Sequence, residues 1–356
     1  MLGQLTASLR WRRPTLRVGA RARLTLVALS KLGLVGYSAT MASDVISLNS
    51  RAAALCREMV SCADDLQIRV EKAACGTTLF DCGIQVPGSR EAAILLARVC
   101  LADLAEVTVD DSAAPWPAVK VVVHDPVRAC LASQYAGWEI KGVKFFAMGS
   151  GPMRAAAGRE SLFDEIGFRE TASECVGVLE ASKLPPDAVC VEIAEKCGIE
   201  PERLALLVAP THSLCGTLQI VARSVETALH KLHVLEFDLT RILAGRGTAP
   251  LPPLVENDFV AIGRTNDAIL YGAQVVLEVC GDDESLQAIG PHIPSIASAD
   301  YGRPFAEIMA HYDNDFYRVD PLLFSPAEIQ LVNLDTGNSF RFGEVNRTLL
   351  SQSFLS

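Results

Sequence analysis

The chain has 356 residues, of which 50% are hydrophobic and 21% charged, so it can bury sizeable cores and is most simply two domains. Its formal net charge of −10 argues against a nucleic-acid partner, because phosphate backbones attract basic surfaces. The eleven cysteines are odd in number and form no C-x-x-C pair, which predicts reduced thiols and a cytoplasmic location instead of a disulfide framework.

Residues 1–40 differ in composition from the rest of the chain. They contain seven basic residues and no acidic residue, with a short apolar patch at 24–29. A targeting segment is one interpretation, although the patch is too short to span a membrane. A translation start at Met41 is the other, and we favour it because so many unpaired cysteines suit the cytoplasm. We therefore expect residues 1–40 to form a basic extension outside the fold, and we expect no membrane partner.

After a predicted helix at 50–63, strand, strand and helix patterns follow one another three times. The segments are 67–74, 77–82 and 89–102, then 106–109, 119–124 and 127–138, and finally 328–334, 338–342 and 344–350. This order predicts a mixed α/β fold and suggests a repeated ββα unit. The identity between the three units is too low to show a duplication.

Between these units, the first motif with chemical content is G-S-G-P at 149–152. It lies between a strand pattern at 143–148 and a helix pattern at 153–157. Such a tight turn can point backbone N–H groups at an anion, although a plain connecting turn is the simpler interpretation. If the turn contacts a ligand, Arg154 is a candidate cation for an acidic group.

The second half of the chain continues the alternation. Strands are predicted at 174–179, 204–208 and 275–279, with a helix at 187–197. Residues 245–253 are rich in Gly and Pro and are the clearest predicted loop, either a connector between domains or the margin of a cleft.

Residues 209–233 are the most informative stretch. They begin with Pro and Gly after an apolar run and continue as a predicted helix with Arg223, Glu226, His230 and His233 at intervals of three, four and three. At about 100° per residue these four share one face, while apolar residues turn toward the core. An arginine one turn before a glutamate orients the carboxylate and favours its ionised form, whereas burial has the opposite effect. An ordinary surface ion pair is the alternative.

The two histidines also allow a metal interpretation, with Asp313 and Asp315 as distant carboxylates. H-x-x-H lacks the i, i+4 spacing and the adjacent glutamate of the zinc-binding helix. We therefore expect no metal site.

Five segments resemble the methenyltetrahydromethanopterin cyclohydrolase family. They are 149–155, 209–232, 261–272, 294–305 and 315–326, the last with the unusual sequence D-F-Y-R-V-D-P-L-L-F-S-P. The resemblance spans about residues 44–345. It implies that water adds to the methenyl carbon between N5 and N10 of a reduced pterin and that the ring opens to the N5-formyl compound. It also implies that the pterin is the substrate, that no further cofactor is used, and that the chain forms a homotrimer.

The methenyl carbon belongs to a cation and is already electrophilic, so the reaction requires proton transfer but neither a metal nor a covalent nucleophile. In the family this role belongs to the glutamate of an R-x-x-E pair, which matches Glu226, with Arg223 as its support. A metal-dependent amidohydrolase and a non-catalytic pterin-binding protein are the alternative functions.

Other polar residues are substrate-binding candidates by position. Capping is the simpler role for Ser213, and Gln219 suits a pterin edge. A turn predicted between apolar segments 259–262 and 268–271 would present three polar residues, for which turn formation is the alternative role. Tyr301 is a candidate for stacking, with packing as the alternative. The full set is Ser150, Gly151, Arg154, Thr211, Ser213, Gln219, Arg264, Asn266, Asp267 and Tyr301.

We expect two packed α/β domains with a substrate cleft between them. The predicted domains are residues 41–170 and 171–356, and the second carries the catalytic helix. The boundary is open, and either domain can be discontinuous in sequence.

Overall fold

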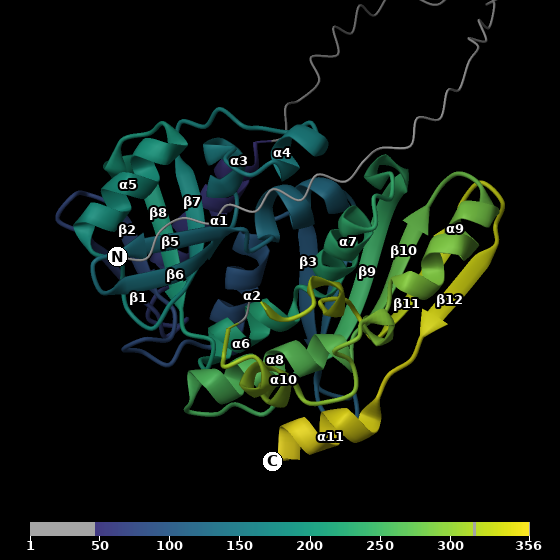
Figure 1. Cartoon of the computed structure of the whole chain (residues 1–356). Helices are drawn as coiled ribbons and strands as arrows, with labels where there is room; N and C mark the ends of the chain where they lie inside the picture. Colours follow the sequence, from purple (N-terminus) through teal and green to yellow (C-terminus); the bar gives the residue numbers. More distant parts are fainter. Residues whose placement is uncertain (1–46, 316–317, 356) are drawn as a thin grey trace, which may run out of the picture. The chain divides into compact units, whose positions relative to one another are not determined.

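The computed structural model describes residues 47–315 and 318–355, which contain two mixed six-stranded sheets (Figure 1). The first sheet has the order β1 (Arg69–Lys72), β2 (Thr78–Asp81), β8 (Leu204–Ala209), β7 (Cys175–Glu180), β6 (Phe145–Ser150) and β5 (Trp138–Gly142). The second has the order β12 (Ser339–Gly343), β11 (Glu328–Asn333), β10 (Gln274–Val279), β9 (Ile242–Pro250), β4 (Ala118–Val123) and β3 (Ala105–Asp110). The predicted mixed α/β class is confirmed.

The two sheets draw strands from both sides of residue 170. β3 and β4 precede this position but belong to the second sheet, whereas β7 and β8 follow it and belong to the first. A boundary at residue 170 stays a prediction.

The predicted order of strand, strand and helix is confirmed. Three antiparallel hairpins, β1–β2, β3–β4 and β11–β12, are each followed by a helical segment, namely α2 (Arg90–Cys100), the π-helix η1 (Val127–Gln134) and α11 (Arg347–Leu355). A fourth unit, the antiparallel pair β5–β6 followed by α3 (Met153–Ala157), has the same order.

Helices cover both faces of the first sheet. Almost every residue of β7 and β8 is buried, as expected for parallel strands packed on both sides. On one face, α5 (Asp187–Cys197) contributes Val189 and Ile193 to an apolar cluster with Leu179 and Leu206. The opposite face packs against α1 (Leu48–Ser61) and α2.

A single apolar cluster joins the two sheets. It includes Val178 of the first sheet, Leu277 of the second, Leu218 of α6 (Leu214–Val221) and Leu229 of α7 (Ser224–Val234). Figure 1 shows α6 and α7 in the space between the sheets. The helix expected to carry the catalytic pair therefore lies in the interior, where burial can change the pKa of a carboxyl group.

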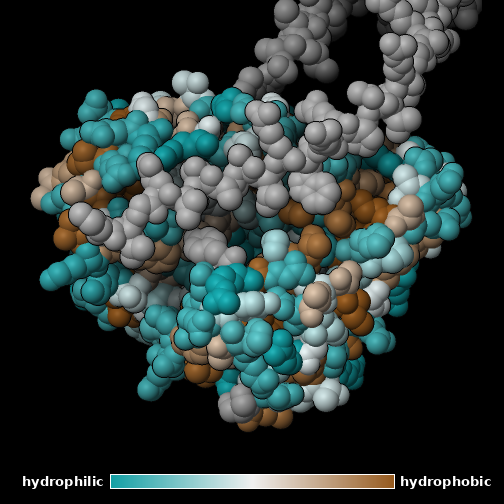
Figure 2. Space-filling view, in the orientation of Figure 1, coloured by the Kyte–Doolittle hydropathy of each residue, from teal (hydrophilic) through white to brown (hydrophobic). Residues whose placement is uncertain are grey.

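One face of the second sheet stays open to solvent. Along β10 the residues Val275, Leu277 and Val279 are buried and the alternate positions are more exposed, which is the pattern of a sheet packed on one side. On the side of the molecule seen in Figure 2, hydrophobic residues form separate groups among hydrophilic ones. Val234 and Leu243 are among the exposed apolar residues near α7 and β9.

The remaining elements are the 13-residue helix α8, which is largely buried, and several shorter segments. They are α4 (Leu162–Glu165), α8 (Asp258–Leu270), α9 (Asp283–Ile289), α10 (Phe305–His311), and the 3₁₀ turns η2 (Pro201–Arg203), η3 (Leu239–Arg241), η4 (Gly290–His292), η5 (Ser295–Ala297) and η7 (Pro321–Leu323). No helix within residues 47–315 and 318–355 is long and apolar enough to cross a bilayer. The basic extension predicted at 1–40 lies outside the described residues.

The loop predicted at 245–253 is wrong for most of its length, because β9 runs through Pro250 and pairs with both β10 and β4. The glycines serve close packing. A Cβ on Gly245 would lie 2.8 Å from Val225 Cγ1, and one on Gly247 would lie 2.2 Å from Ser224 Oγ. Both glycines therefore allow the start of α7 to approach the strand, which is a recognised use of glycine within strands.

Two further predictions need correction. The helix expected within residues 209–233 is interrupted at Ala222 and Arg223, so Arg223 precedes α7 and does not belong to the same regular helix as Glu226. The turn expected near 263–267 is wrong, because α8 is continuous from Asp258 to Leu270. A helix with few apolar residues at its centre was mistaken for a turn.

Candidate active site

Glu226 and Arg223 meet at the start of α7. Glu226 lies in the first turn of the helix and is 4% exposed, while Arg223 is 8% exposed. Arg223 Nη1 lies 3.8 Å from Glu226 Oε2, so the charges interact without a direct hydrogen bond. The carboxylate also faces the positive end of the helix dipole. This geometry leaves the lone pairs of Glu226 available to a water molecule or a substrate.

The pKa of the Glu226 carboxyl reflects two opposing effects. Burial raises it to about 7, and the guanidinium groups of Arg223 and Arg154 hold it down. A carboxyl with this pKa exchanges a proton readily near neutral pH, as a general base that later acts as an acid must do.

Arg223 contacts two other predicted positions, Ser150 and Gln219. Its Nη2 donates to Ser150 Oγ at 3.1 Å and to Gln219 Oε1 at 3.0 Å, and its Nη1 donates to the carbonyl of Gln134. Ser150 ends β6 and Gln219 lies on α6, so the guanidinium links the first sheet to the helices between the sheets. Ser150 and Gln219 therefore hold the arginine, and through it they orient Glu226.

Arg154, the candidate cation for an acidic group of the ligand, lies in the interior and is bonded to other groups of the protein. It is 1% exposed, its Nε donates to Glu160 Oε1 at 2.9 Å, and its Nη1 donates to the carbonyls of Leu131 and Ser133 at 2.9 and 3.3 Å. These bonds satisfy carbonyls at the end of η1, where the backbone lacks partners. These bonds favour a structural role for Arg154 beside Arg223 and Glu226.

The turn at 149–152 is likewise organised by internal bonds. Gly151 has a φ of +87°, and its N–H donates to Ser133 O at 2.9 Å. A Cβ at this position would lie 3.2 Å from the Val178 nitrogen, which explains the glycine. This N–H is therefore engaged by the protein and is not presented to an anion.

His230 also faces this region but is engaged by a ring. It stacks on Tyr135 with ring centroids 4.8 Å apart, and Arg154 lies 5.0 Å from the centroid of the same tyrosine. Burial, assisted by the charges of His233 and Arg154, lowers the pKa of His230 to about 4. His230 is therefore neutral at pH 7 and supports Tyr135.

Thr211 and Ser213 lie in the loop after β8. Ser213 caps α6 by accepting a hydrogen bond from Gly216 N at 3.0 Å, so the capping role is confirmed. Thr211 donates its hydroxyl to Glu180 Oε1, at the carboxyl end of β7. The pKa of Glu180 is raised by burial, and the bond from Thr211 and the charge of Arg223 counteract this effect.

The candidates on α8 are engaged in structural contacts. Arg264 donates to the carbonyls of Ser353 and Pro253 at 3.2 and 3.1 Å, which ties α8 to α11. Asn266 donates to Ile262 O in its own helix at 2.8 Å. These bonds engage Arg264 and Asn266 within the fold, and their contact with a substrate stays a prediction.

Asp267 and Tyr301 also make structural contacts. Asp267 accepts from Phe305 N at 2.8 Å, which fixes the start of α10. Tyr301 packs edge-to-face on Tyr271 with centroids 5.1 Å apart. These contacts favour the packing alternative for Tyr301 and a structural role for Asp267.

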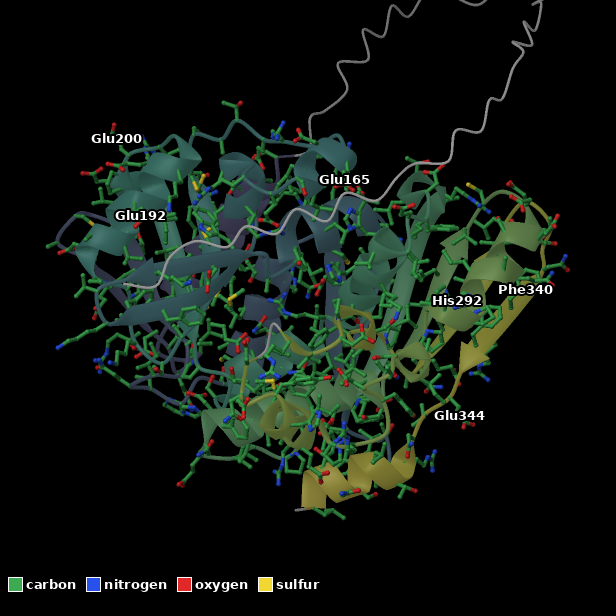
Figure 3. The ribbon with its side chains drawn as sticks, viewed as in Figure 1. Glu165, Glu192, Glu200, His292, Phe340 and Glu344 are labelled. Atoms are coloured by element: carbon green, nitrogen blue, oxygen red, sulfur yellow. The ribbon has the colours of Figure 1, made fainter. Side chains whose placement is uncertain are left out.

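The proposed metal residues are paired with other groups. His233 Nε2 lies 2.7 Å from Glu165 Oε2 on α4, a residue labelled in Figure 3, and Asp313 pairs with Arg318. Among the residues placed by the structure, no three His, Cys, Asp or Glu side chains gather as a metal site would require.

Three residues of the site were not identified from the sequence. Gln134 and Tyr135 end a π-helical segment, a feature that often marks functional sites but has no reliable sequence pattern. Glu180 did have a signal, since it ends the apolar strand C-V-G-V-L-E, and ligands commonly bind at the carboxyl ends of parallel strands.

Comparison with known proteins found a matching family model and several similar proteins. A family model described as "Cyclohydrolase (MCH)" matches residues 47–354. The methenyltetrahydromethanopterin cyclohydrolase of Methylobacillus flagellatus is 44% identical over 312 residues, which cover 86% of this chain and 95% of that protein. The protein of the same name from Methylobacterium organophilum is 45% identical over 316 residues, covering 86% and 97%. The one from Methanocaldococcus jannaschii is 39% identical over 317 residues, covering 87% and 98%.

Proposed function

Because this chain belongs to the cyclohydrolase (MCH) family, we propose that it hydrolyses the cyclic amidinium of 5,10-methenyl-tetrahydromethanopterin to the N5-formyl compound. The reaction is reversible and releases one proton per molecule hydrolysed. The pterin is the substrate, and the protein contributes proton transfer and orientation.

In the first step, Glu226 removes a proton from a water molecule as the water oxygen bonds to the methenyl carbon. The positive charge of the amidinium is thereby neutralised, and a tetrahedral hydroxy compound forms. Arg223 keeps Glu226 ionised before this step, because its guanidinium opposes the effect of burial on the carboxyl pKa.

In the second step, the protonated Glu226 returns its proton to N10 as the bond between the carbon and N10 breaks. The hydroxyl group loses its proton to solvent and becomes the formyl carbonyl. One carboxyl group can serve both steps because its pKa is near the working pH.

The observation that carries this proposal is the buried pair of Arg223 and Glu226, with its 3.8 Å separation and a carboxyl pKa near 7. The test is to mix the purified protein with the methenyl compound and follow loss of its absorbance. We expect Glu226→Gln to lower kcat by at least about 100-fold, the lower end of a general acid–base contribution, with little change in substrate binding. Near-normal turnover by this variant would remove Glu226 from the mechanism.

The alternative functions give different results in the same assay. A metal-dependent amidohydrolase would lose activity with a chelator and regain it with a divalent ion. A pterin-binding protein without activity would bind the compound and leave its absorbance unchanged. The proposed steps need no metal, so we expect full turnover in the presence of a chelator.

We also propose a cytoplasmic location and a homotrimer. All eleven cysteines are free thiols, which suits a reducing compartment. The trimer follows from the family resemblance, and a light-scattering mass other than three times that of the chain would contradict it.

A further inference from the structure

Glu180 differs from the structural carboxylates of this protein in how few bonds it makes. Asp81 accepts hydrogen bonds from the backbone N–H groups of Gly83, Ile84 and Gln85 at 3.0, 2.6 and 2.9 Å. Glu170 accepts from the backbone and side chains at the start of α1. Within residues 47–315 and 318–355, the only hydrogen bond recorded for the Glu180 carboxylate is the one from Thr211.

The position of Glu180 is that of a ligand-binding residue. It is the last residue of β7 and pairs with Met148 and Ala209, so it lies where the neighbouring parallel strands β7 and β8 both end. Ligands of α/β sheets commonly bind outside this edge. Arg223 holds down the pKa of Glu180 as well as that of Glu226, which shows that one guanidinium acts on both carboxyl groups.

The surroundings of Glu180 are held rigidly. Thr217 Oγ1 donates to Thr211 O at 2.9 Å. Asp258 Oδ1 accepts from the backbone N–H of His212 at 3.1 Å and lies 2.6 Å from Nδ1 of the same residue. The loop that carries the Thr211 hydroxyl is therefore fixed on both sides. Since an ionised carboxylate has about four acceptor positions, one bond from Thr211 leaves most of them for a ligand.

We propose that Glu180 is a substrate-binding residue whose carboxylate accepts hydrogen bonds from the adjacent N–H and amino groups on the pyrimidine edge of the pterin. This inference rests on the proposed function, because it names the part of the same substrate that Glu180 recognises. A carboxylate matches such a pair of donors in both geometry and charge.

The first test measures kinetics of Glu180→Gln with the methenyl compound. The amide replaces one acceptor oxygen by a donor, so we expect KM to rise about tenfold to 100-fold, the usual effect of losing a hydrogen bond to a charged group. We expect kcat to change by less than about threefold, unlike the loss expected for Glu226→Gln. Glu192→Gln, which removes an exposed carboxylate on α5, is the matched control and should leave both constants unchanged (Figure 3).

The second test separates recognition of the ring edge from attraction of the cation. Binding of the neutral reduced pterin, which lacks the methenyl bridge, is measured by quenching of tryptophan fluorescence. If Glu180 binds the pyrimidine edge, Glu180→Gln weakens binding of the neutral and the cationic compound by the same factor. If Glu180 only attracts the positive charge of the methenyl compound, Glu180→Gln binds the neutral compound as tightly as the wild type does, and the inference is wrong.

Two variants of Thr211 test the same contact without changing Glu180 itself. Thr211→Val removes the hydroxyl that orients Glu180 and should raise KM by a smaller factor, while Thr211→Ser should restore it. A folded Glu180→Gln protein with unchanged KM and unchanged affinity for both compounds would overturn the inference and leave the proposed function intact. Failure of the wild-type protein to consume the methenyl compound would instead refute the proposed function, and the binding test of Glu180 could still be performed.

Discussion

The raised pKa of Glu226 predicts that removing its charge stabilises the protein at alkaline pH. An unfolded glutamate has a pKa of 4.5, whereas burial raises that of Glu226 to about 7 in the folded chain. Between these values the folded state binds one proton more than the unfolded state, so stability falls as pH rises through this window. Above pH 7 the wild-type protein must keep an ionised carboxylate in its interior. In Glu226→Gln the side chain at position 226 is neutral at every pH, so this variant does not bury an ionised carboxylate there.

The size of the effect follows from the shift. A difference between 4.5 and about 7 corresponds to about 3 kcal/mol at 1.36 kcal/mol per pKa unit. We compare the free energy of unfolding of Glu226→Gln with that of the wild type. This difference should favour the variant by up to about 3 kcal/mol more at pH 8 and above than at pH 4.5. The charge of Arg223 is already included, because it contributes to the pKa.

The measurement is the urea midpoint and slope of both proteins at several pH values between 4.5 and 8.5, followed by tryptophan fluorescence at one protein concentration. Glu192→Gln is the control, because Glu192 is exposed on α5 and pairs with Lys196. A difference between Glu226→Gln and wild type that is constant with pH would refute the assignment of a raised pKa to Glu226. A difference that shrinks with rising pH would mean that the pKa of Glu226 is lowered, not raised, in the folded protein.

Three further predictions concern the same site and its support. The wild-type kcat/KM for hydrolysis should fall about tenfold per pH unit below pH 7, as Glu226 becomes protonated. Arg223→Gln should move this acidic limb of the pH–rate profile to higher pH, because the variant lacks the charge that lowers the pKa of Glu226. An unmoved limb would exclude Arg223 as the group that lowers this pKa. Gly247→Ala should lower the free energy of unfolding by about 1–3 kcal/mol and reduce kcat, because the new Cβ would lie 2.2 Å from Ser224 Oγ and displace the start of α7. An unchanged melting temperature would contradict this packing. Arg154→Ala should lower the melting temperature because it removes the bonds from Arg154 to the partly buried Glu160 and to the Leu131 carbonyl of η1. An unchanged melting temperature with a raised KM would restore its role as a substrate-binding cation.

The sequence predicted local elements well where periodicity and caps agreed. The predicted helices at 153–157 and 187–197 match α3 and α5, and the strands of both sheets were found within a few residues, apart from β5 and β9. β9 was missed because its glycines, which suggest a loop locally, are required by packing against α7. The break before α7 was missed because the Arg223 and Glu226 spacing suits a continuous helix equally well.

The sequence predicted that Arg223 and Glu226 lie together, and it named Ser150 and Gln219 but not their contacts with Arg223. Arg223 and Glu226 are close in sequence, so their spacing alone places them together. The environment of Arg154 depends on η1 and on Glu160, and the position of Glu180 depends on pairing between β7 and β8. Such contacts between distant segments leave no pattern in a single sequence, although Glu180 itself could have been noticed as the end of an apolar strand.

The bonds of Arg154 and Arg223, the two arginines whose charges act on Glu226, determine the charge that a substrate meets. Arg154 is neutralised by a direct bond to Glu160, and His230 is neutral at pH 7 because its pKa is about 4. Arg223 donates to neutral acceptors, so its charge acts on Glu226 and Glu180 together. With both carboxyl groups ionised, this cluster carries one net negative charge, which complements the single positive charge of the methenyl compound. Hydrolysis makes the pterin neutral, so the electrostatic attraction is lost when the product forms and its release is favoured.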